Sequence, residues 1–320
     1  MARRSVLFTP GDRRAMLEGA PDTGADVIVF DLEDGVAPDQ KASARATVRS
    51  VLADDSFDPD AECLVRVNPI GGGSVTASRE GDEAEEAKVE TEKGREMVAK
   101  RECAYVADVR ALAPVSDAVD GVVLPKVRSG SDVRRIGGEL RSHGLPRTVF
   151  ALVETAAGIQ QAPAIAEAGA TDALVIGTED LAADVGSSPA DDRRESSYAR
   201  QRVVTAAAAA GVDAIDTLWT SFEDEDGLKS DATDAVALGF DGKLAIHPAQ
   251  VPILNEAFTP SAEQRDWAGR VLAAREEADG QGAFAVDGEM IDAPLIARAE
   301  RIVDRARAAG LSVSISTDAE

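Results

Sequence analysis

Residues 148–154 read Thr-Val-Phe-Ala-Leu-Val-Glu, an almost continuous apolar run that ends in a carboxylate. A strand of this composition is covered on both faces, as the strands of a parallel sheet are. Seven further runs of this kind lie at Ser5–Thr9, Val27–Asp31, Cys63–Asn68, Gly121–Lys126, Ala173–Gly177, Val212–Leu218 and Lys243–His247. Alanine-rich amphipathic segments lie between them, such as Lys41–Leu52, Gln160–Ala168 and Tyr198–Ala210. Eight strand–helix units that close on one another predict an α/β fold, a (β/α)8 TIM barrel.

Two segments fall outside this repeat. Residues 71–101 begin Gly-Gly-Gly-Ser and continue through Glu80-Gly-Asp-Glu-Ala-Glu-Glu, which predicts a solvated acidic insertion after the third strand. The alternative is a cover over the mouth of the barrel. We assign residues 1–250 to the barrel with this insertion, and residues 251–320 to a C-terminal helical appendage that acts as a lid or a subunit contact.

The charge of the chain is strongly negative. It has 58 Asp and Glu against 34 Lys and Arg, a net charge of −24, and only seven of the basic residues are lysines. Such a surface stays hydrated in concentrated salt, where screening removes most of the self-repulsion. The composition therefore predicts a halophilic protein, with an ordinary acidic enzyme as the alternative. The sign of the charge disfavours nucleic acid and anionic membranes as partners.

The remaining bulk features are those of a cytoplasmic enzyme. Two cysteines, Cys63 and Cys103, give neither a disulfide framework nor zinc-ligand spacing. No apolar stretch reaches the length of a membrane span. The first residues, Met-Ala-Arg-Arg, lead directly into the first strand without the apolar core of a signal peptide.

Ionisable residues follow nearly every predicted strand. In a (β/α)8 barrel the chemistry lies at the carboxyl ends of the strands, and a barrel with a purely structural role does not need charges of both signs there. The strand ends carry Arg13 and Arg14, Asp31, Glu33 and Asp34, Arg66, Lys126, Glu154, Asp180 and His247.

Glu154 and Asp180 follow neighbouring strands and offer only oxygen ligands. Two carboxylates completed by water and substrate oxygens suit Mg²⁺ or Mn²⁺, whereas nothing in the sequence favours zinc. Helix capping or a salt bridge to Arg66 or Lys126 is the structural alternative for this pair. Arg66 can bind a substrate carboxylate through two hydrogen bonds, or it can neutralise the acidic residues after the second strand.

Other chemistries lack their motifs. The sequence has no P-loop, no dinucleotide fingerprint after the first strand and no G-x-S-x-G elbow. A Schiff-base aldolase needs a lysine at a strand end, and Lys126 is the one candidate. The nearby carboxylates are expected to raise the pKa of Lys126, which disfavours that role.

A set of short motifs in order along the chain resembles the citrate lyase β-subunit-like family, which includes malyl-CoA and β-methylmalyl-CoA lyases. The motifs are Arg4-Ser-Val-Leu-Phe-Thr-Pro-Gly, Asp31-Leu-Glu-Asp-Gly-Val, Arg66-Val-Asn, Leu124-Pro-Lys-Val, Leu152-Val-Glu-Thr, Gly177-Thr-Glu-Asp-Leu, Gly239-Phe-Asp-Gly-Lys-Leu-Ala-Ile-His-Pro and Asp287-Gly-Glu-Met-Ile-Asp-Ala-Pro. Each motif alone is weak, and the ordered set, from about residue 4 to 305, is specific.

The resemblance implies roles for particular residues. It implies metal ligation by Glu154 and Asp180, carboxylate binding by Arg66, and water ordering by Asp34 and Lys126, with Asp31 and Glu33 beside the site. It further implies an acid/base at Asp292, carried on the lid of a neighbouring subunit in a homotrimer or homohexamer. Arg13 or Arg14 is expected to meet the phosphates of CoA. Metal-dependent pyruvate aldolases carry a histidine where this chain has Asp34, which favours the CoA-dependent branch.

The implied activity is reversible cleavage of malyl-CoA or β-methylmalyl-CoA. The products are glyoxylate and acetyl-CoA or propionyl-CoA, so CoA enters as part of the substrate. Three alternatives remain open at this point: a malyl-CoA thioesterase or malate synthase-like hydrolase, a citrate lyase β subunit acting on a citryl thioester, and a binding protein without catalysis.

Overall fold

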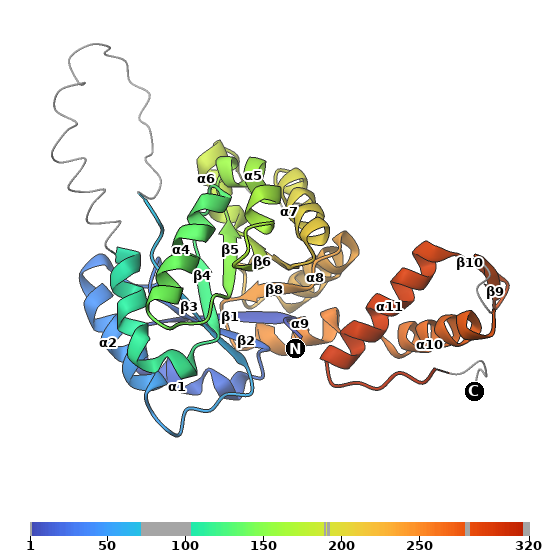
Figure 1. Ribbon diagram of the computed structural model, residues 1–320, viewed down its shortest axis with the longest axis horizontal. Helices are drawn as coiled ribbons and strands as arrows, with labels where there is room; N and C mark the ends of the chain where they lie inside the picture. Colours follow the sequence, from blue (N-terminus) through green and yellow to red (C-terminus); the bar gives the residue numbers. More distant parts are fainter. Residues whose placement is uncertain (1, 72–103, 189, 191–192, 279–281, 316–320) are drawn as a thin grey trace, which may run out of the picture.

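In the computed structural model, which describes residues 2–71, 104–188, 190, 193–278 and 282–315, eight parallel strands form a closed barrel in sequence order (Figure 1). Closure occurs where Ser5 and Val6 pair with Lys243 and Leu244. The strands are β1 (Ser5–Pro10), β2 (Val27–Asp31), β3 (Glu62–Arg66), β4 (Gly121–Leu124), β5 (Val149–Val153), β6 (Thr171–Ile176), β7 (Asp213–Asp216) and β8 (Gly242–Ala245). The predicted barrel is confirmed.

Helices surround the barrel as the alternating sequence pattern predicts (Figure 1). Those between the strands are α1 (Arg14–Gly19), α2 (Lys41–Leu52), α4 (Gly130–Ser142), α5 (Ala156–Ala166), α6 (Thr178–Val185), α7 (Ser197–Ala210) and α8 (Glu225–Leu238), with short 3-10 turns η1 (Pro21–Thr23), η2 (Pro38–Gln40) and η4 (Ala113–Ala118). The predicted acidic insertion lies outside the described residues except for Gly71. None of the helices in the described part of the chain has the length and apolarity needed to cross a membrane.

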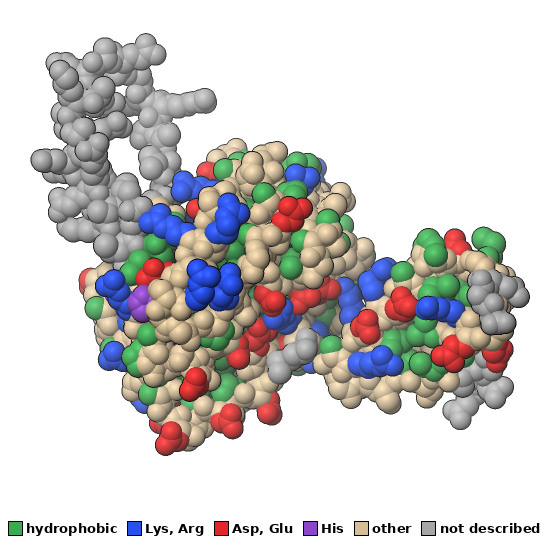
Figure 2. All heavy atoms as spheres, in the orientation of Figure 1, with side chains coloured by type: hydrophobic (Ala, Val, Ile, Leu, Met, Phe, Trp, Pro, Cys, Tyr) green, Lys and Arg blue, Asp and Glu red, His purple; other side chains and the backbone are tan. Residues whose placement is uncertain are grey.

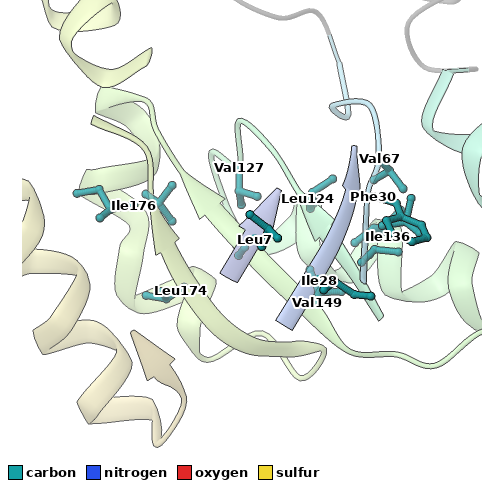
Figure 3. Close-up of a cluster of buried hydrophobic side chains, with 14 of the residues drawn as sticks. Leu7, Ile28, Phe30, Val67, Leu124, Val127, Ile136, Val149, Leu174 and Ile176 are labelled. Carbon is teal, nitrogen blue, oxygen red and sulfur yellow. The ribbon is translucent and has the colours of Figure 1, made fainter. Parts of the chain in front are cut away.

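Alternate residues of each strand pack on opposite sides of the barrel wall. In β2, Val27 and Val29 point into the barrel, whereas Ile28 and Phe30 pack outward against the helices. Figure 3 shows part of this outer layer, including Phe30 and Ile136 of α4. Burial of one such side chain contributes on the order of 1.5–3 kcal/mol. The near-continuous apolar strands follow from having two buried faces.

A chain of alternating buried charges joins β7 and β8 to the helical layer. Lys243, which is fully buried, lies 2.8 Å from Asp216 and 2.6 Å from Asp231. Arg200 of α7 binds both carboxylate oxygens of Asp216, and Arg193 lies 2.6 Å from Asp231. Each charge in this network therefore has a partner of opposite sign, as buried charges require.

The helix α9 (Gln250–Phe258) completes the barrel's helical layer, because Val251, Leu254 and Phe258 belong to the main apolar core. Beyond it, α10 (Ala262–Glu277), β9 (Phe284–Val286), β10 (Glu289–Ile291) and α11 (Ala293–Ala308) form an appendage with its own small apolar cluster. Asp287 and Gly288 both have positive φ angles, as the two-residue turn of a tight hairpin requires.

The appendage projects away from the barrel (Figure 1). Near the carboxyl end of α11, Nη2 of Arg305 donates to the carbonyl of Phe240 at 3.0 Å and to Asp241 at 2.8 Å. Both partners precede β8, so this contact is on the amino-terminal face of the barrel. The β9–β10 hairpin lies at the far end of the appendage.

Candidate active site

A pocket of about 260 Å³ lies at the carboxyl ends of the strands. Its lining falls into a polar part supplied by β2, β3, β5 and β6 and an apolar part supplied by β7, β8 and β1. The lining side chains include Asp31, Arg66, Glu154 and Asp180 on the polar side, and Phe8, Leu218, Leu244 and Ile246 on the apolar side. The prediction that ionisable strand ends meet at one face is confirmed for these polar residues.

Arg66 is held by the acidic residues after β2. Its Nε and Nη2 atoms donate to the two carboxylate oxygens of Asp31 at 2.7 and 2.6 Å, and Nη1 lies 3.2 Å from Glu33. The guanidinium also lies over the ring of Phe8, with 5.0 Å between Cζ and the ring centroid. Neutralisation of Asp31 and Glu33, the structural role foreseen for Arg66, therefore occurs, and it fixes the guanidinium plane at the pocket wall.

Glu154 is a buried carboxyl group directly after β5. Burial, together with repulsion from Asp180, raises the pKa of Glu154 to about 8. Its Oε1 atom accepts a 2.8 Å hydrogen bond from the backbone N–H of Lys126. Gly177 leaves room for the carboxylate, because a Cβ at that position would lie 2.6 Å from Oε2 of Glu154.

Lys126 lies at the centre of the acidic cluster. Its Nζ atom is 2.7 Å from Glu33, 3.0 Å from Asp34 and 3.8 Å from Asp180. Burial lowers the pKa of Lys126, but the surrounding carboxylates outweigh burial, and the net shift is upward. The expectation that these carboxylates keep Lys126 charged is confirmed, which disfavours a Schiff-base role. Lys126 also has a positive φ of 54°, a strained conformation of the kind found at functional sites.

Asp180 lies in the first turn of α6 and is not its capping residue. The N-cap is Gly177, which makes no side-chain cap, so the capping alternative for Asp180 is not realised. Asp180 and Glu154 line the same pocket, and the charge of Asp180 adds to burial in raising the pKa of Glu154. A cation between the two carboxylates would offset this repulsion.

The donor set fits a hard divalent cation with incomplete protein coordination. Within the described residues, no group of three or more His, Cys, Asp or Glu side chains is arranged to hold a metal. A cation at Glu154 and Asp180 would therefore take its other ligands from water and substrate, as Mg²⁺ commonly does. Acidic side chains outnumber basic ones at the carboxyl ends of the strands. The acidic residues are Asp31, Glu33, Asp34, Glu154 and Asp180, and the basic residues are Arg66 and Lys126. This excess of carboxylates also favours a bound cation.

Six predicted residues lie outside the lining of this pocket. Glu33, Asp34 and Lys126 line a second pocket, and Arg13, Arg14 and Asp292 line neither of the two. Arg13 is exposed beside Asp12, and Arg14 contacts Glu18 and Ser50 on the outer surface. Asp292 is the N-cap residue of α11 and makes no side-chain cap. The structure therefore leaves Asp292 on the appendage, about 20 Å along α11 from Arg305 at a rise of 1.5 Å per residue.

Two threonines of the pocket were not foreseen. The backbone N–H and the hydroxyl of Thr178 lie 3.2 and 2.9 Å from the hydroxyl of Thr217, and both side chains are buried. Thr217 directly follows β7, the one strand at whose end no ionisable residue was predicted. The predicted run extended to Leu218, two residues beyond the observed end at Asp216, and so concealed Thr217 within a strand.

The fold and the polar mouth together define a (β/α)8 barrel of the enzyme type, with ionisable groups at the strand ends. The sequence matches the HpcH/HpaI aldolase/citrate lyase family over residues 4–80 and 99–248, so the chain belongs to that family. The resemblance drawn from the short motifs is confirmed.

Individual relatives are similar over almost the whole chain. A mitochondrial citramalyl-CoA lyase of Mus musculus is 33% identical, over 94% of this chain and 85% of the relative. A (3S)-malyl-CoA thioesterase of Cereibacter sphaeroides is 34% identical, over 95% of each chain. The crystal structure of CitE from Mycobacterium tuberculosis in complex with magnesium, acetoacetate and coenzyme A superposes with a TM-score of 0.71 at 35% identity, covering 96% of this chain and 99% of that one.

Proposed function

We propose that this protein is a metal-dependent carbon–carbon lyase that cleaves malyl-CoA or β-methylmalyl-CoA to glyoxylate and acetyl-CoA or propionyl-CoA. The observation that carries the proposal is the pairing of Glu154 and Asp180 in one pocket with Arg66. A cation at the carboxylates and a guanidinium beside it suit a 2-hydroxy acid, which presents a hydroxyl and a carboxylate together.

The relatives support a CoA thioester as the substrate. Two of them are named for malyl-CoA and citramalyl-CoA, and the CitE complex contains magnesium and coenzyme A. We assign Mg²⁺ or Mn²⁺ to Glu154 and Asp180, with Asp34 and Lys126 ordering the surrounding water. When bound, the cation supplies electrostatic stabilisation of the developing charge on the 2-hydroxy-acid oxygens.

Arg66 would orient the substrate by binding the carboxylate of the substrate. Asp31 holds two nitrogens of the guanidinium, so the plane is fixed before the substrate arrives. The weaker 3.2 Å contact between Nη1 and Glu33 is the one that a substrate carboxylate can displace. Binding the carboxylate here leaves the thioester end of the substrate to extend from the polar side of the pocket.

Proton transfer at the thioester α-carbon is assigned to Asp292 of the partner subunit. In cleavage, the 2-hydroxyl releases its proton to solvent and its oxygen becomes the carbonyl oxygen of glyoxylate as the bond between the two carbon fragments breaks. The electron pair of that bond forms the thioester enolate, whose α-carbon then takes a proton from the carboxyl group of Asp292. In condensation, the carboxylate removes the same proton. A thioester is required because its carbonyl makes that proton acidic enough for a carboxylate to remove.

We further propose a homotrimer or homohexamer in which Asp292 reaches the pocket of a neighbouring subunit. The appendage that carries Asp292 contacts the amino-terminal face of its own barrel through Arg305, whereas the pocket opens at the carboxyl ends of the strands. Asp292 is therefore better placed to reach another subunit than its own pocket. We place the protein in the cytoplasm, with acyl-CoA and glyoxylate as its small-molecule partners.

A hydrolytic activity is the second candidate, because one relative is named as a malyl-CoA thioesterase. A pyruvate-releasing reaction is a variant of the first candidate, since another relative is named as a citramalyl-CoA lyase. Cleavage releases a 2-oxo acid and an acyl-CoA, whereas hydrolysis releases free CoA and a hydroxy acid. The products therefore distinguish the two classes.

The deciding experiment offers malyl-CoA, β-methylmalyl-CoA and citramalyl-CoA to the purified protein with Mg²⁺ in high KCl. Glyoxylate trapped by phenylhydrazine, together with acetyl-CoA or propionyl-CoA, is the expected result. Glu154→Ala and Asp180→Ala should abolish turnover, and a chelator should do so reversibly. Free CoA and malate without glyoxylate would replace the lyase with the thioesterase.

A further inference from the structure

The strand ends of β7 and β8 separate where they form the apolar side of the pocket. Their last paired residues are Asp216 and Lys243. Leu218 and Ile246, which lie beyond these residues in the sequence, both line the pocket. Backbone pairing between these strands therefore stops before the segments that contact the pocket. Another interaction must hold these two segments in register.

The side chain of Gln250 provides this connection. Its Nε2 donates to the carbonyl oxygen of Trp219 at 2.9 Å, and its Oε1 accepts from the backbone N–H groups of Ile246 at 2.9 Å and His247 at 3.2 Å. Gln250 is 1% exposed. One buried amide thus joins Trp219, the residue after Leu218, to Ile246. It does so beyond the point where backbone pairing between β7 and β8 ends.

Helix capping explains only one of these contacts. Gln250 is the first residue of α9, and its bond from the N–H of His247, three residues earlier, has the direction and spacing of a capping-box glutamine. The bonds to Ile246 and to the carbonyl of Trp219 have no place in that motif. These two contacts connect the strand ends.

We propose that Gln250 is a positioning residue that sets the apolar side of the pocket and, through it, the selectivity for the acyl group of the CoA thioester. The proposal rests on the proposed function for the nature of the ligand. Carboxylates and Arg66 occupy the polar side, so the apolar contacts open to an alkyl group on the thioester α-carbon come from Phe8, Pro10, Leu152, Leu218, Leu244 and Ile246. Gln250 bonds directly to Ile246 and to Trp219, the residue after Leu218.

Gln250→Glu is the most specific single substitution for testing this bridge. It keeps the volume of the side chain and an oxygen that accepts from Ile246 and His247, but an ionised carboxylate cannot donate to the carbonyl of Trp219. We expect the segment that carries Leu218 to move while the segment that carries Ile246 keeps its bond. Gln264→Glu, in the exposed capping box of α10, makes the same chemical change away from the pocket and serves as the control.

The test measures calorimetric dissociation constants for acetyl-CoA and propionyl-CoA, with Mn²⁺ affinity and the thermal midpoint recorded in parallel. Gln250→Glu should weaken the binding of propionyl-CoA about tenfold and the binding of acetyl-CoA about threefold. The affinity for Mn²⁺ should stay within twofold of that of the wild type. Ile246→Ala, which leaves the backbone bond to Gln250 in place, should shift the ratio between the two thioesters in the same direction. Gln264→Glu should change neither constant.

Three results would overturn the inference. Unchanged affinities in Gln250→Glu would remove its role, as would a parallel loss of thioester affinity, Mn²⁺ affinity and thermal midpoint, which marks general support of the fold. A wild-type protein that binds neither thioester would overturn this inference and the proposed substrate class together, whereas wild-type binding with an insensitive Gln250→Glu variant would overturn this inference alone.

Discussion

Gly177 lies directly against Glu154: a Cβ on Gly177 would stand 2.6 Å from Oε2 of Glu154 and 2.9 Å from its Cβ. The first distance is shorter than any ordinary contact between such atoms. The loop after β6, which leads to Asp180, can therefore approach the end of β5 only because residue 177 lacks a side chain. The glycine sets the separation of the two predicted metal ligands.

Gly177→Ala is expected to displace the Glu154 carboxylate and weaken Mn²⁺ binding at least tenfold. Equilibrium dialysis against Mn²⁺ measures the change directly. Gly169→Ala is the matched control, since a Cβ at Gly169 meets no atom within 4 Å, and its Mn²⁺ affinity should stay within twofold of the wild type. Equal affinity in the Gly177→Ala variant would show that Glu154 does not ligate the metal.

The pKa of Glu154 predicts a pH dependence for metal binding. Because burial and Asp180 raise this pKa to about 8, Glu154 carries a proton at neutral pH that a cation must displace. Mn²⁺ affinity should rise with pH, by up to roughly tenfold per unit below pH 8, and level off above it. Titrations from pH 6.5 to 9 in weak buffer should also show proton release. A flat profile without proton release contradicts the assignment.

The buried charge network predicts a large effect on stability from one substitution. Lys243→Met removes the cation between Asp216 and Asp231, and leaves two buried carboxylates undercompensated. The expected loss is about 3–5 kcal/mol in the free energy of unfolding, measured by urea denaturation. Lys229→Met removes the same charge from the exposed face of α8 and should cost no more than about 0.5 kcal/mol. Similar losses in both variants would contradict a specific role for the network.

The composition predicts that salt stabilises the protein. Asp and Glu side chains are present on both the barrel and the appendage in the view of Figure 2, and the net charge of the chain is −24. The screening length falls from about 10 Å at 0.1 M salt to about 3 Å at 1 M, so repulsion between these charges weakens across that range. The thermal midpoint and turnover should rise with KCl. Sucrose at equal osmolality is the control. A thermal midpoint and turnover that are highest in dilute buffer would contradict the prediction of a halophilic protein.

The fold and the polar side of the pocket could be predicted because nearly every apolar run carries its own polar end. Glu154 and Asp31 lie at strand ends in the sequence, and barrel closure brings them to one face without further information. Thr217 and Gln250 could not be found in this way, since their roles depend on where β7 stops pairing with β8. That position is set by packing between strands distant in sequence, which no local pattern records.

Asp292 shows the same limit at a larger scale. The sequence assigns it to the C-terminal helical appendage, and in the structure it is the N-cap residue of α11 (Ala293–Ala308). Whether it meets Glu154 depends on how the appendage sits on another subunit, and a single chain contains no information on that contact. Its assignment therefore stays a prediction that needs an experiment on the assembled protein.

The last prediction tests this arrangement. Asp292→Asn should reduce turnover at least a hundredfold while Mn²⁺ and acyl-CoA affinities stay within about twofold, because proton transfer contributes about 10²–10⁴ and acts in the transition state. Arg66→Ala should be inactive for a different reason, since it loses the group that orients the substrate.

If Asp292 serves a neighbouring pocket, subunits of the two inactive variants mixed after reversible dissociation will form some pockets that hold wild-type Arg66 and receive wild-type Asp292. Activity should then return to a fraction set by the mixing ratio, with the mixture of Asp292→Asn and wild type as the calibration. Exchange is verified by mass-tagged subunits in native mass spectrometry. Proven exchange without recovered activity would place Asp292 in its own subunit's pocket, and the extended position of the appendage would then have to change during the catalytic cycle.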